Sequence, residues 1–282
     1  HPGQNLINGL HCKGDQKMSF RNIVAGAVVA FGMALGGGAV SAAVIDLGFA
    51  LDKSGSVGSA NYNTTKEALA TALGLIPTTG DNQYRVSVVS FGSSVTVDLA
   101  PTIVTADTIS AIQNAVRNSS YSGGGTRTDL AISSLTNAFV NADGGLGDLT
   151  LFNISTDGSP SSQANTLTAA NAARTAGVDG ISFEAIGSFS QTQLNNMAAL
   201  ASPGTPVIVH DLDQIPNPTE HGFVIAVTGF DAYQAAINAK VERIIEDTGG
   251  GTTPIPLPAS LPLLLAGLGL VGGLRLRRKH AA

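Results

Sequence analysis

Between residues 44 and 245 the sequence alternates short apolar runs with longer stretches that suit amphipathic helices. The first run, 44–52, is almost continuously apolar, as expected for a strand covered on both faces of a sheet. Strands that alternate with helices in this way predict an α/β domain with a doubly wound, mostly parallel sheet flanked by helices. Strands are expected at 44–52, 84–91, 94–99, 149–156, 178–186 and 222–227, and helices at 60–75, 105–116, 129–140, 161–176, 191–200 and 230–245.

The charge of the chain is unevenly distributed. Residues 44–254 hold 19 acidic and 8 basic residues, a net charge of −11, whereas the whole chain has −5. A nucleic-acid partner requires a basic surface, so this composition argues against one. The single cysteine, Cys12, lies outside this region, which therefore has neither a disulfide framework nor a cysteine metal site.

Two signatures of hydrolytic enzymes are missing from the sequence. The five histidines never form the HExxH spacing of a zinc-binding helix, and no GxSxG nucleophile motif occurs. A Ser-His-Asp triad has no fixed spacing, so the histidines alone leave that arrangement open.

The segment 18–43 has the composition of a secretory signal peptide. Arg21 provides a short basic start, 23–35 is apolar and free of charge, and Ser41, Ala42 and Ala43 are small residues suited to cleavage. The alternative is a buried core helix. We expect residues 1–17 to be an untranslated or leader segment, and the folded domain to occupy 44–247.

The last 28 residues predict a membrane-spanning helix. No charge occurs from Ala259 to Leu274, and these 16 residues would form a helix about 24 Å long, slightly short of a hydrocarbon core of about 30 Å. A basic cluster follows and is expected to stay cytoplasmic: Arg275, Arg277, Arg278 and Lys279. The preceding residues 248–254, rich in Gly and Thr, suit a flexible linker.

This tail resembles the PEP-CTERM sorting signal in its Val-Pro-Leu-Pro-Ala variant. The motif stands here with Ile255 in the Val position, followed by Pro256, Leu257, Pro258 and Ala259. An apolar helix and an Arg-rich end follow in the family's order. The resemblance implies processing by an exosortase, with a protein anchored in the inner membrane in transit and then placed at the cell surface or outside the cell. A plain C-terminal anchor is the alternative.

Polar side chains follow two of the predicted strands at the point where each ends. Asp52, Ser54 and Ser56 follow the first strand, and Asp157 follows the strand 149–156. In open α/β sheets ligands bind outside the carboxyl ends of the strands. Carboxylate and hydroxyl oxygens are ligands for a hard divalent cation such as Mg²⁺, so a metal site is expected here.

These residues resemble the metal-ion-dependent adhesion site of the von Willebrand factor A domain family. The family's Asp-x-Ser-x-Ser motif stands as Asp52, Ser54 and Ser56, its loop threonine as Thr126 after Gly123–Gly125, and its third element as Asp157 in a Thr-Asp-Gly context. The resemblance covers roughly 44–245 and implies a Rossmann-like sheet.

By this resemblance Ser54, Ser56 and Thr126 coordinate the metal directly. Asp52 and Asp157 act through water or alternate as ligands, and one position is left for a carboxylate of the partner. The ion is expected to be Mg²⁺ or Mn²⁺, with Ca²⁺ less suited.

We also make predictions for three features near or outside the metal site. Asp129 is expected to cap the helix that follows Thr126, with a water-mediated metal contact as the alternative. Lys53 is expected to point outward. The segment 201–220 is expected to be a structured surface excursion in which Asp211 and Asp213 are solvated loop acids or, alternatively, part of a second cation site.

The leading functional prediction is a non-enzymatic, secreted or cell-surface binding module. Its metal would bind an acidic group on a surface protein or polysaccharide, as in adhesion. The alternatives are a metal-dependent hydrolase and a structural extracellular-matrix protein. A single hydroxyl-rich site without an evident general base or a second metal speaks against the hydrolase.

Overall fold

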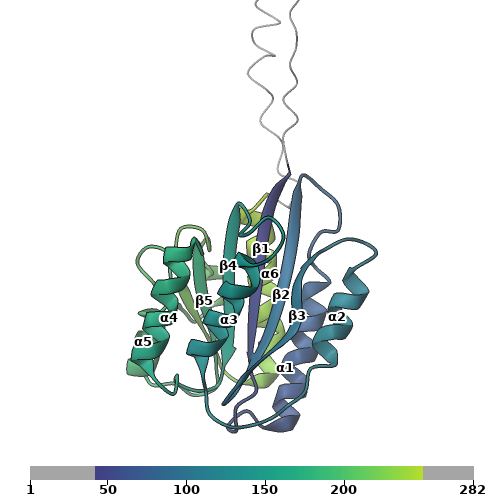
Figure 1. The fold of residues 1–282 in the computed structure, drawn as a ribbon. Coiled ribbons are helices and arrows are strands. Elements are labelled where there is room, and N and C mark those ends of the chain that lie inside the picture. Colours follow the sequence, from purple (N-terminus) through teal and green to yellow (C-terminus); the bar gives the residue numbers. More distant parts are fainter. Residues whose placement is uncertain (1–41, 250–282) are drawn as a thin grey trace, which may run out of the picture. The chain divides into compact units, whose positions relative to one another are not determined.

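The computed structural model describes residues 42–249, which form a seven-stranded sheet in the order β3-β2-β1-β4-β5-β7-β6 (Figure 1). β1 lies parallel to both β2 and β4, whereas β3 runs antiparallel to β2. The predicted doubly wound, mostly parallel sheet is confirmed. The strands are β1 (Ala43–Asp52), β2 (Asn82–Phe91), β3 (Val95–Ile103), β4 (Leu149–Thr156), β5 (Gly180–Ile186), β6 (Val207–Val209) and β7 (Phe223–Val227).

Helices cover both faces of the sheet (Figure 1). One hydrophobic core lies between the sheet and α1, α2 and α6, and a second lies between the sheet and α3, α4 and α5. This double cover explains why β1 and β2 are buried over eight consecutive residues each. The helices are α1 (Gly58–Leu73), α2 (Ile109–Arg117), α3 (Thr128–Val140), α4 (Gln163–Ala176), α5 (Gln191–Ala198) and α6 (Phe230–Asp247), with a short 3₁₀ helix η1 (Leu212–Gln214).

Local hydrogen bonds set the helix ends. The Ser162 side chain accepts from the Asn165 amide and starts α4, which stops at Gly177 in the left-handed conformation with φ of 108°. α2 begins at Ile109 and not at the predicted residue 105, because Thr105 and Thr108 close a turn in which the Thr105 amide donates to Thr108 Oγ1 at 2.9 Å. The predicted excursion at 201–220 contains the edge strand β6, which at three residues is too short for a periodic pattern.

A fully buried ion pair joins α6 to the sheet. Lys240 of α6 donates to Glu184 of β5, and both side chains are 0% exposed. The Ser155 hydroxyl on β4 donates to the other Glu184 oxygen at 2.7 Å and lies 2.7 Å from the Tyr233 hydroxyl of α6. Since every charged oxygen has a partner, the cost of burying this pair is offset by its own hydrogen bonds.

The described chain enters and leaves the domain at the same end. Thr248, which follows α6, accepts a hydrogen bond from Asn82 and lies 2.8 Å from the Tyr84 hydroxyl, both near the start of β2. The predicted leader and most of the signal peptide, and nearly all of the linker and sorting signal, lie outside the described residues. Within 42–249 no helix combines the length and hydrophobicity needed to span a bilayer.

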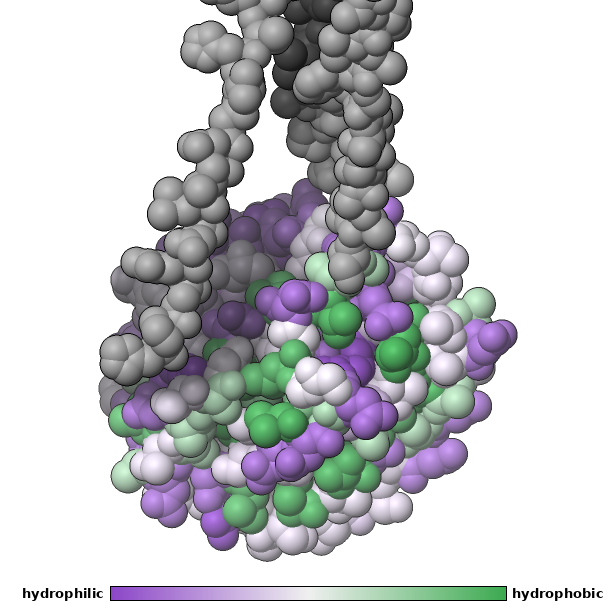
Figure 2. All heavy atoms as spheres, turned by 45° about the horizontal axis from the view of Figure 1, so that its top comes forward, coloured by the Kyte–Doolittle hydropathy of each residue, from purple (hydrophilic) through white to green (hydrophobic). Residues whose placement is uncertain are grey.

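Large hydrophobic side chains are scattered over the surface. In the view that brings the amino ends of the strands forward, green and purple residues are interspersed (Figure 2). The exposed members include Val97 and Ile103 on the edge strand β3 and Val140 at the end of α3. Single exposed apolar residues of this kind are normal for a folded domain.

Replacing Lys240 by Met should destabilise the domain by about 3–5 kcal/mol, because Glu184 would keep a buried charge without its partner. The double change Lys240→Met with Glu184→Gln should recover most of this loss. Chemical denaturation of the full chain measures both, with Lys66→Met on the half-buried surface of α1 as the control, expected to cost about 1 kcal/mol or less. A Lys240→Met loss no larger than that of the control would show that the buried Lys240–Glu184 pair does not hold Glu184 at a cost to stability.

Candidate metal site at the carboxyl ends of β1 and β4

The pairing of β1 with β4 brings two carboxylates to one edge of the sheet. Leu51 pairs with Ser155, so Asp52, the last residue of β1, lies beside Thr156, and Asp157 follows directly. The Thr156 hydroxyl donates to Asp52 Oδ2 at 2.6 Å and fixes the carboxylate across the two strands. The end of β1 and the end of β4 therefore lie side by side at this edge of the sheet.

The loop after β1 carries two hydroxyls to the same point. The Ser54 amide donates to Asp52 Oδ1 at 2.7 Å, which turns the chain immediately after the strand. Ser54 Oγ lies 3.2 Å from Ser56 Oγ, and Ser56 Oγ donates to Asp157 Oδ1 at 2.7 Å. A chain of short polar contacts thus connects Asp52, Ser54, Ser56 and Asp157.

The glycine-rich loop packs directly on this turn. The Gly55 amide donates to the Gly124 carbonyl at 2.8 Å, and the Gly123 amide donates to the Lys53 carbonyl at 3.0 Å. Gly124 has φ of 96°, and a Cβ there would lie 2.3 Å from Ser93 Oγ. Glycine is required at this position both by the left-handed backbone and by the close approach of Ser93.

Thr126 completes the group beside Gly158. A Cβ on Gly158 would lie 3.5 Å from Thr126 Oγ1 and 3.9 Å from Ser56 Oγ, so the missing side chain leaves a space that both hydroxyls face. The Thr126 backbone is held by Ser161, whose hydroxyl accepts from the Thr126 amide at 3.0 Å and whose amide donates to the Thr126 carbonyl at 2.9 Å. Thr126 and Ser56 therefore border the same space, and short contacts link Ser56 to Ser54 and Asp157 and, through the Ser54 amide, to Asp52.

The donor set fits a hard divalent cation. It consists of three hydroxyls and two carboxylates, and oxygen ligands of this kind suit Mg²⁺ and Mn²⁺. Neighbouring ligands of an octahedral ion at about 2.1 Å lie about 3.0 Å apart. The Ser54–Ser56 and Ser56–Asp157 oxygen distances, 3.2 and 2.7 Å, are close to that spacing.

Burial makes the two carboxylates of the site unusually basic. Removal from water raises the pKa of Asp52 to about 6, although hydrogen bonds from Thr156 and Ser54 act in the opposite direction. Burial also raises the pKa of Asp157, against the hydrogen bond from Ser56. A cation bound between them would compensate the negative charge that burial disfavours.

Two expectations about neighbouring residues are wrong. Lys53 does not point outward: it is 3% exposed, and its Nζ donates to Thr96 Oγ1 of β3 at 2.8 Å, because the β2–β3 hairpin folds over it. Asp129 does not cap α3. Its carboxylate accepts two hydrogen bonds from Arg127, at 2.8 and 2.7 Å, and this pairing lowers the Asp129 pKa.

Asp211 and Asp213 of the 201–220 segment lie on the surface, as expected for solvated loop acids. Both side chains are exposed, and the Asp211 carboxylate accepts a hydrogen bond from the Asp213 amide at 3.2 Å at the start of η1. Within residues 42–249 no group of three His, Cys, Asp or Glu side chains is arranged to hold a metal ion. The candidate metal site is not such a group, since most of its ligands are hydroxyls.

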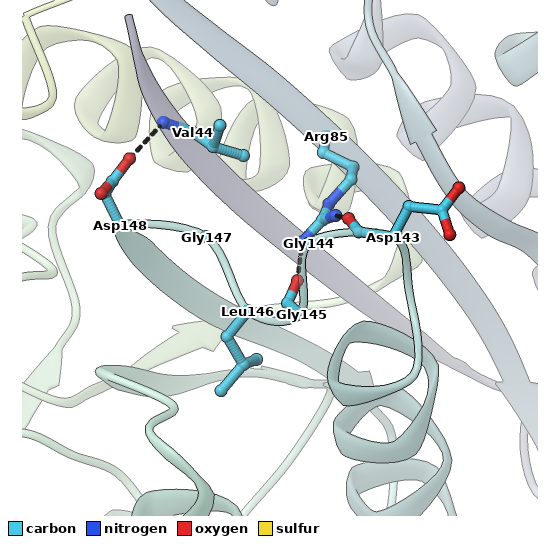
Figure 3. A pocket seen from close by; sticks show the side chains of 8 residues that line it. All are labelled: Val44, Arg85, Asp143, Gly144, Gly145, Leu146, Gly147 and Asp148. Atoms are coloured by element: carbon cyan, nitrogen blue, oxygen red, sulfur yellow. Dashed lines mark hydrogen bonds between the residues drawn. The ribbon is translucent and has the colours of Figure 1, made fainter. Parts of the chain in front are cut away.

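A hollow of about 260 Å³ at the opposite end of the sheet has a structural role (Figure 3). The Arg85 guanidinium donates to both oxygens of the buried Asp46 at 2.7 Å, and to the carbonyls of Asp143 and Gly145 at 3.0 and 2.6 Å. The Gly147 amide donates to Asp46 at 2.7 Å. This ion pair closes the loop between α3 and β4, and its donors and acceptors are used within the protein.

Sequence reasoning missed the residues that support the site. Thr156, Ser161, Ser93 and Tyr121 hold the ligand loops by hydrogen bonds, the last from its hydroxyl to the Ser54 carbonyl at 3.3 Å. Thr156 lies inside the Thr-Asp-Gly motif and was within reach of sequence analysis. The other three depend on loops that meet only in the folded chain.

Replacing Asp52 by Asn should stabilise the metal-free domain at pH 7.5 by up to about 3 kcal/mol. The folded carboxyl keeps its proton to about pH 6, whereas the unfolded one loses it near 3.8. The contribution of Asp52 to stability therefore falls as pH rises from about 4 to about 6 and stays lower above that. The advantage of Asn should shrink as the pH falls below 6.

Denaturation of the full chain in excess chelator, at pH 5 and pH 7.5, measures this difference. Asp213→Asn, on an exposed acid outside the site, serves as control and should show no pH-dependent gain. If the Asp52→Asn variant has a lower free energy of unfolding than the natural protein, and by the same amount at both pH values, burial does not raise the pKa of Asp52.

Comparisons with known proteins place the fold. No curated protein matches the chain. Among solved structures, proximal thread matrix protein 1 from the mussel byssus matches with TM-score 0.53 at 18% identity over 72% of this chain. A von Willebrand factor type A protein from Catenulispora acidiphila matches with TM-score 0.53 at 16% identity over 71%, and the pilus adhesin SpaC from Lactobacillus rhamnosus GG with TM-score 0.51 at 15% over 73%.

This chain corresponds to less than half the length of each of these proteins: 46% of the mussel chain, 42% of the Catenulispora chain and 31% of SpaC. A further structure of the mussel protein, with TM-score 0.52 at 17% identity over 71% of this chain and 46% of that one, is described as having a zinc-occupied MIDAS motif, the metal-ion-dependent adhesion site. At such low sequence identities, the structural similarity shows only that the fold is shared. The family model of the von Willebrand factor type A domain matches residues 46–221, and the chain therefore belongs to that family.

Proposed function

We propose that this protein is a non-enzymatic, metal-dependent binding module exported to the cell surface or beyond. Asp52, Ser54, Ser56, Thr126 and Asp157 would hold one Mg²⁺ or Mn²⁺ ion. The observation that carries the proposal is the chain of short contacts that runs from Asp52 through Ser54 and Ser56 to Asp157, with Thr126 Oγ1 and Ser56 Oγ both beside Gly158.

The bound ion would supply an electrophilic point that attracts a carboxylate of the partner. Three of the five side chains are neutral hydroxyls, which leave most of the positive charge of a divalent ion uncompensated. The loops themselves do the positioning. Tyr121 and Gly124 hold the turn at Ser54 and Gly55, and Ser161 holds Thr126, so the hydroxyls stay aimed without a ligand.

The names of two structural relatives, a thread matrix protein and a pilus adhesin, accord with a binding role rather than catalysis. At their low identity they support no more than that, and the proposal depends on the site. The partner is proposed to carry an acidic group, presented by a surface protein or a polysaccharide.

The full chain should bind one Mg²⁺ or Mn²⁺ ion in calorimetry, and Asp157→Ala should weaken this binding at least about tenfold, since it removes one of two charged groups of the site. Asp213→Ala is a matched control on an exposed acid outside the site and should bind metal like the natural protein. Absence of heat up to millimolar metal, or unchanged affinity in Asp157→Ala, would refute the site.

We also propose that residues 255–282 act as a sorting signal cut near 256–259 by an exosortase. The Ile-Pro-Leu-Pro-Ala motif supports this, because a plain anchor needs the apolar run and the basic end but no such motif. Prolines at 254, 256, 258 and 262 would favour an extended approach that a membrane enzyme could reach.

An epitope tag inserted in the linker at 249–253 allows the size and location of the protein to be followed in hosts with and without an exosortase. A shorter, released or surface-transferred form is expected when the enzyme is present, and it should be lost when Pro256 and Pro258 are replaced by Ala. One full-length, membrane-bound species in both hosts would favour the plain anchor.

A further inference from the structure

The loops around the candidate metal site have an unusual composition. We define the serine rim as residues 92–94, 120–126, 157–162 and 188–190, which follow β2, α2, β4 and β5. Nine of its 19 residues are serine and five are glycine, and Asp157 is its one charged residue. A partner that approaches the metal must lie against this surface, so its chemistry has to match hydroxyl and backbone groups.

Building on the function proposed above, we infer that the acidic group bound at the metal belongs to a polyuronate, an acidic polysaccharide in which each carboxylate is surrounded by hydroxyls. The metal would take the carboxylate, and the serine rim would exchange hydrogen bonds with the neighbouring sugar hydroxyls. A hydroxyl both donates and accepts, so serine matches a sugar hydroxyl in either direction.

Hydrogen bonds join the four segments of the serine rim into one surface. The Gly125 amide donates to Ser93 Oγ at 2.8 Å, and the Thr126 amide donates to Ser161 Oγ at 3.0 Å. Gln193 of α5 then bridges the last two segments, because its Nε2 donates to Ser159 Oγ at 3.2 Å while its Oε1 accepts from Ser190 Oγ at 2.9 Å. The rim is thus held in place before a ligand arrives.

Part of the rim remains available to a ligand. Ser94, Ser120, Ser122 and Ser188 are exposed, and within the described residues their hydroxyls make no hydrogen bond to the protein. They belong to three different segments, after β2, α2 and β5. Because these serines come from three segments, a ligand that contacts all of them has to be extended, as a sugar chain is.

The composition argues against a protein partner at this surface. Protein interfaces are enriched in aromatic residues, Met and Arg and depleted in Ser, and their binding energy concentrates in a few large anchors. The rim has two aromatic residues, Tyr121 and Phe189, both partly buried, and none of the exposed large hydrophobic side chains of the described domain lies on it.

The local charge permits a polyanion although the domain as a whole is acidic. The charged groups at and beside the site are the acids Asp52, Asp157, Asp129 and Asp98 and the bases Lys53 and Arg127, a net of two negative charges. A divalent ion would neutralise this balance. Beyond the site, the rim adds no further acid that would repel a polyuronate.

The test compares three immobilised polymers, with Mg²⁺ and with excess chelator, using the full chain. Polygalacturonate carries carboxylates among hydroxyls, poly-L-glutamate carries carboxylates on a polypeptide, and dextran carries hydroxyls alone. Polygalacturonate should bind in Mg²⁺ at least about tenfold more tightly than either control polymer, and chelator should abolish the binding.

The double variant Ser122→Ala with Ser188→Ala should lose about tenfold in polygalacturonate affinity while its Mg²⁺ affinity in calorimetry stays unchanged. A matched control, Ser110→Ala with Ser134→Ala on α2 and α3, should bind the polymer like the natural protein. Unchanged binding by the rim variant would overturn the inference.

The two proposals fail in different ways. A chain that binds no Mg²⁺ in calorimetry overturns the proposed function together with this inference. A chain that binds Mg²⁺ but prefers poly-L-glutamate, or binds no polymer, overturns the polyuronate inference and leaves the metal site intact.

Discussion

The parallel pairing of β1 with β4 is the constraint on which the rest of the site depends. It places Asp52 beside Thr156, and the hydrogen bond between them at 2.6 Å joins the two strands at the point where both end. Parallel strands need crossover connections, so their carboxyl ends collect loops from distant parts of the sequence. The turn at Ser54, the glycine-rich loop at Thr126 and the loop after β4 meet there because the sheet requires it.

The same topology separates the site from the points where the described chain enters and leaves. β1 starts at Ala43, and α6 returns the chain to Asn82 and Tyr84 at the start of β2, whereas the candidate ligands lie at the other ends of β1 and β4. Within the described residues, the candidate site therefore lies at the end of the sheet opposite to the point where the chain leaves α6. The buried Lys240–Glu184 pair keeps α6, the last element before that point, fixed to the sheet.

Much of this fold could be predicted from sequence, because doubly covered parallel strands are long apolar runs and the helices between them have clear end signals. β4 begins and ends where expected, and Gly177 ends α4. Of the five candidate ligands, Asp52, Ser54, Ser56 and Asp157 could be singled out because they follow strands, whereas Thr126 was assigned only by the resemblance of its loop to that of the von Willebrand factor A family. The burial of Lys53 was not predictable, since a lysine between two ligands gives no sign that the β2–β3 hairpin will bury it. Asp129 was also mispredicted, because rules for helix capping do not include an ion pair with a residue two positions earlier, here Arg127.

The binding of one divalent cation between the ends of β1 and β4 is what we propose above. Diffraction from crystals of the protein grown with Mn²⁺, recorded at the manganese absorption edge, tests it most directly. One anomalous peak is expected at about 2.1 Å from Ser54 Oγ and Ser56 Oγ, in the space beside Gly158. If the crystals are saturated with Mn²⁺ and the anomalous map has no peak at that position, this metal site is wrong. A peak at Asp211 and Asp213 instead would also contradict it.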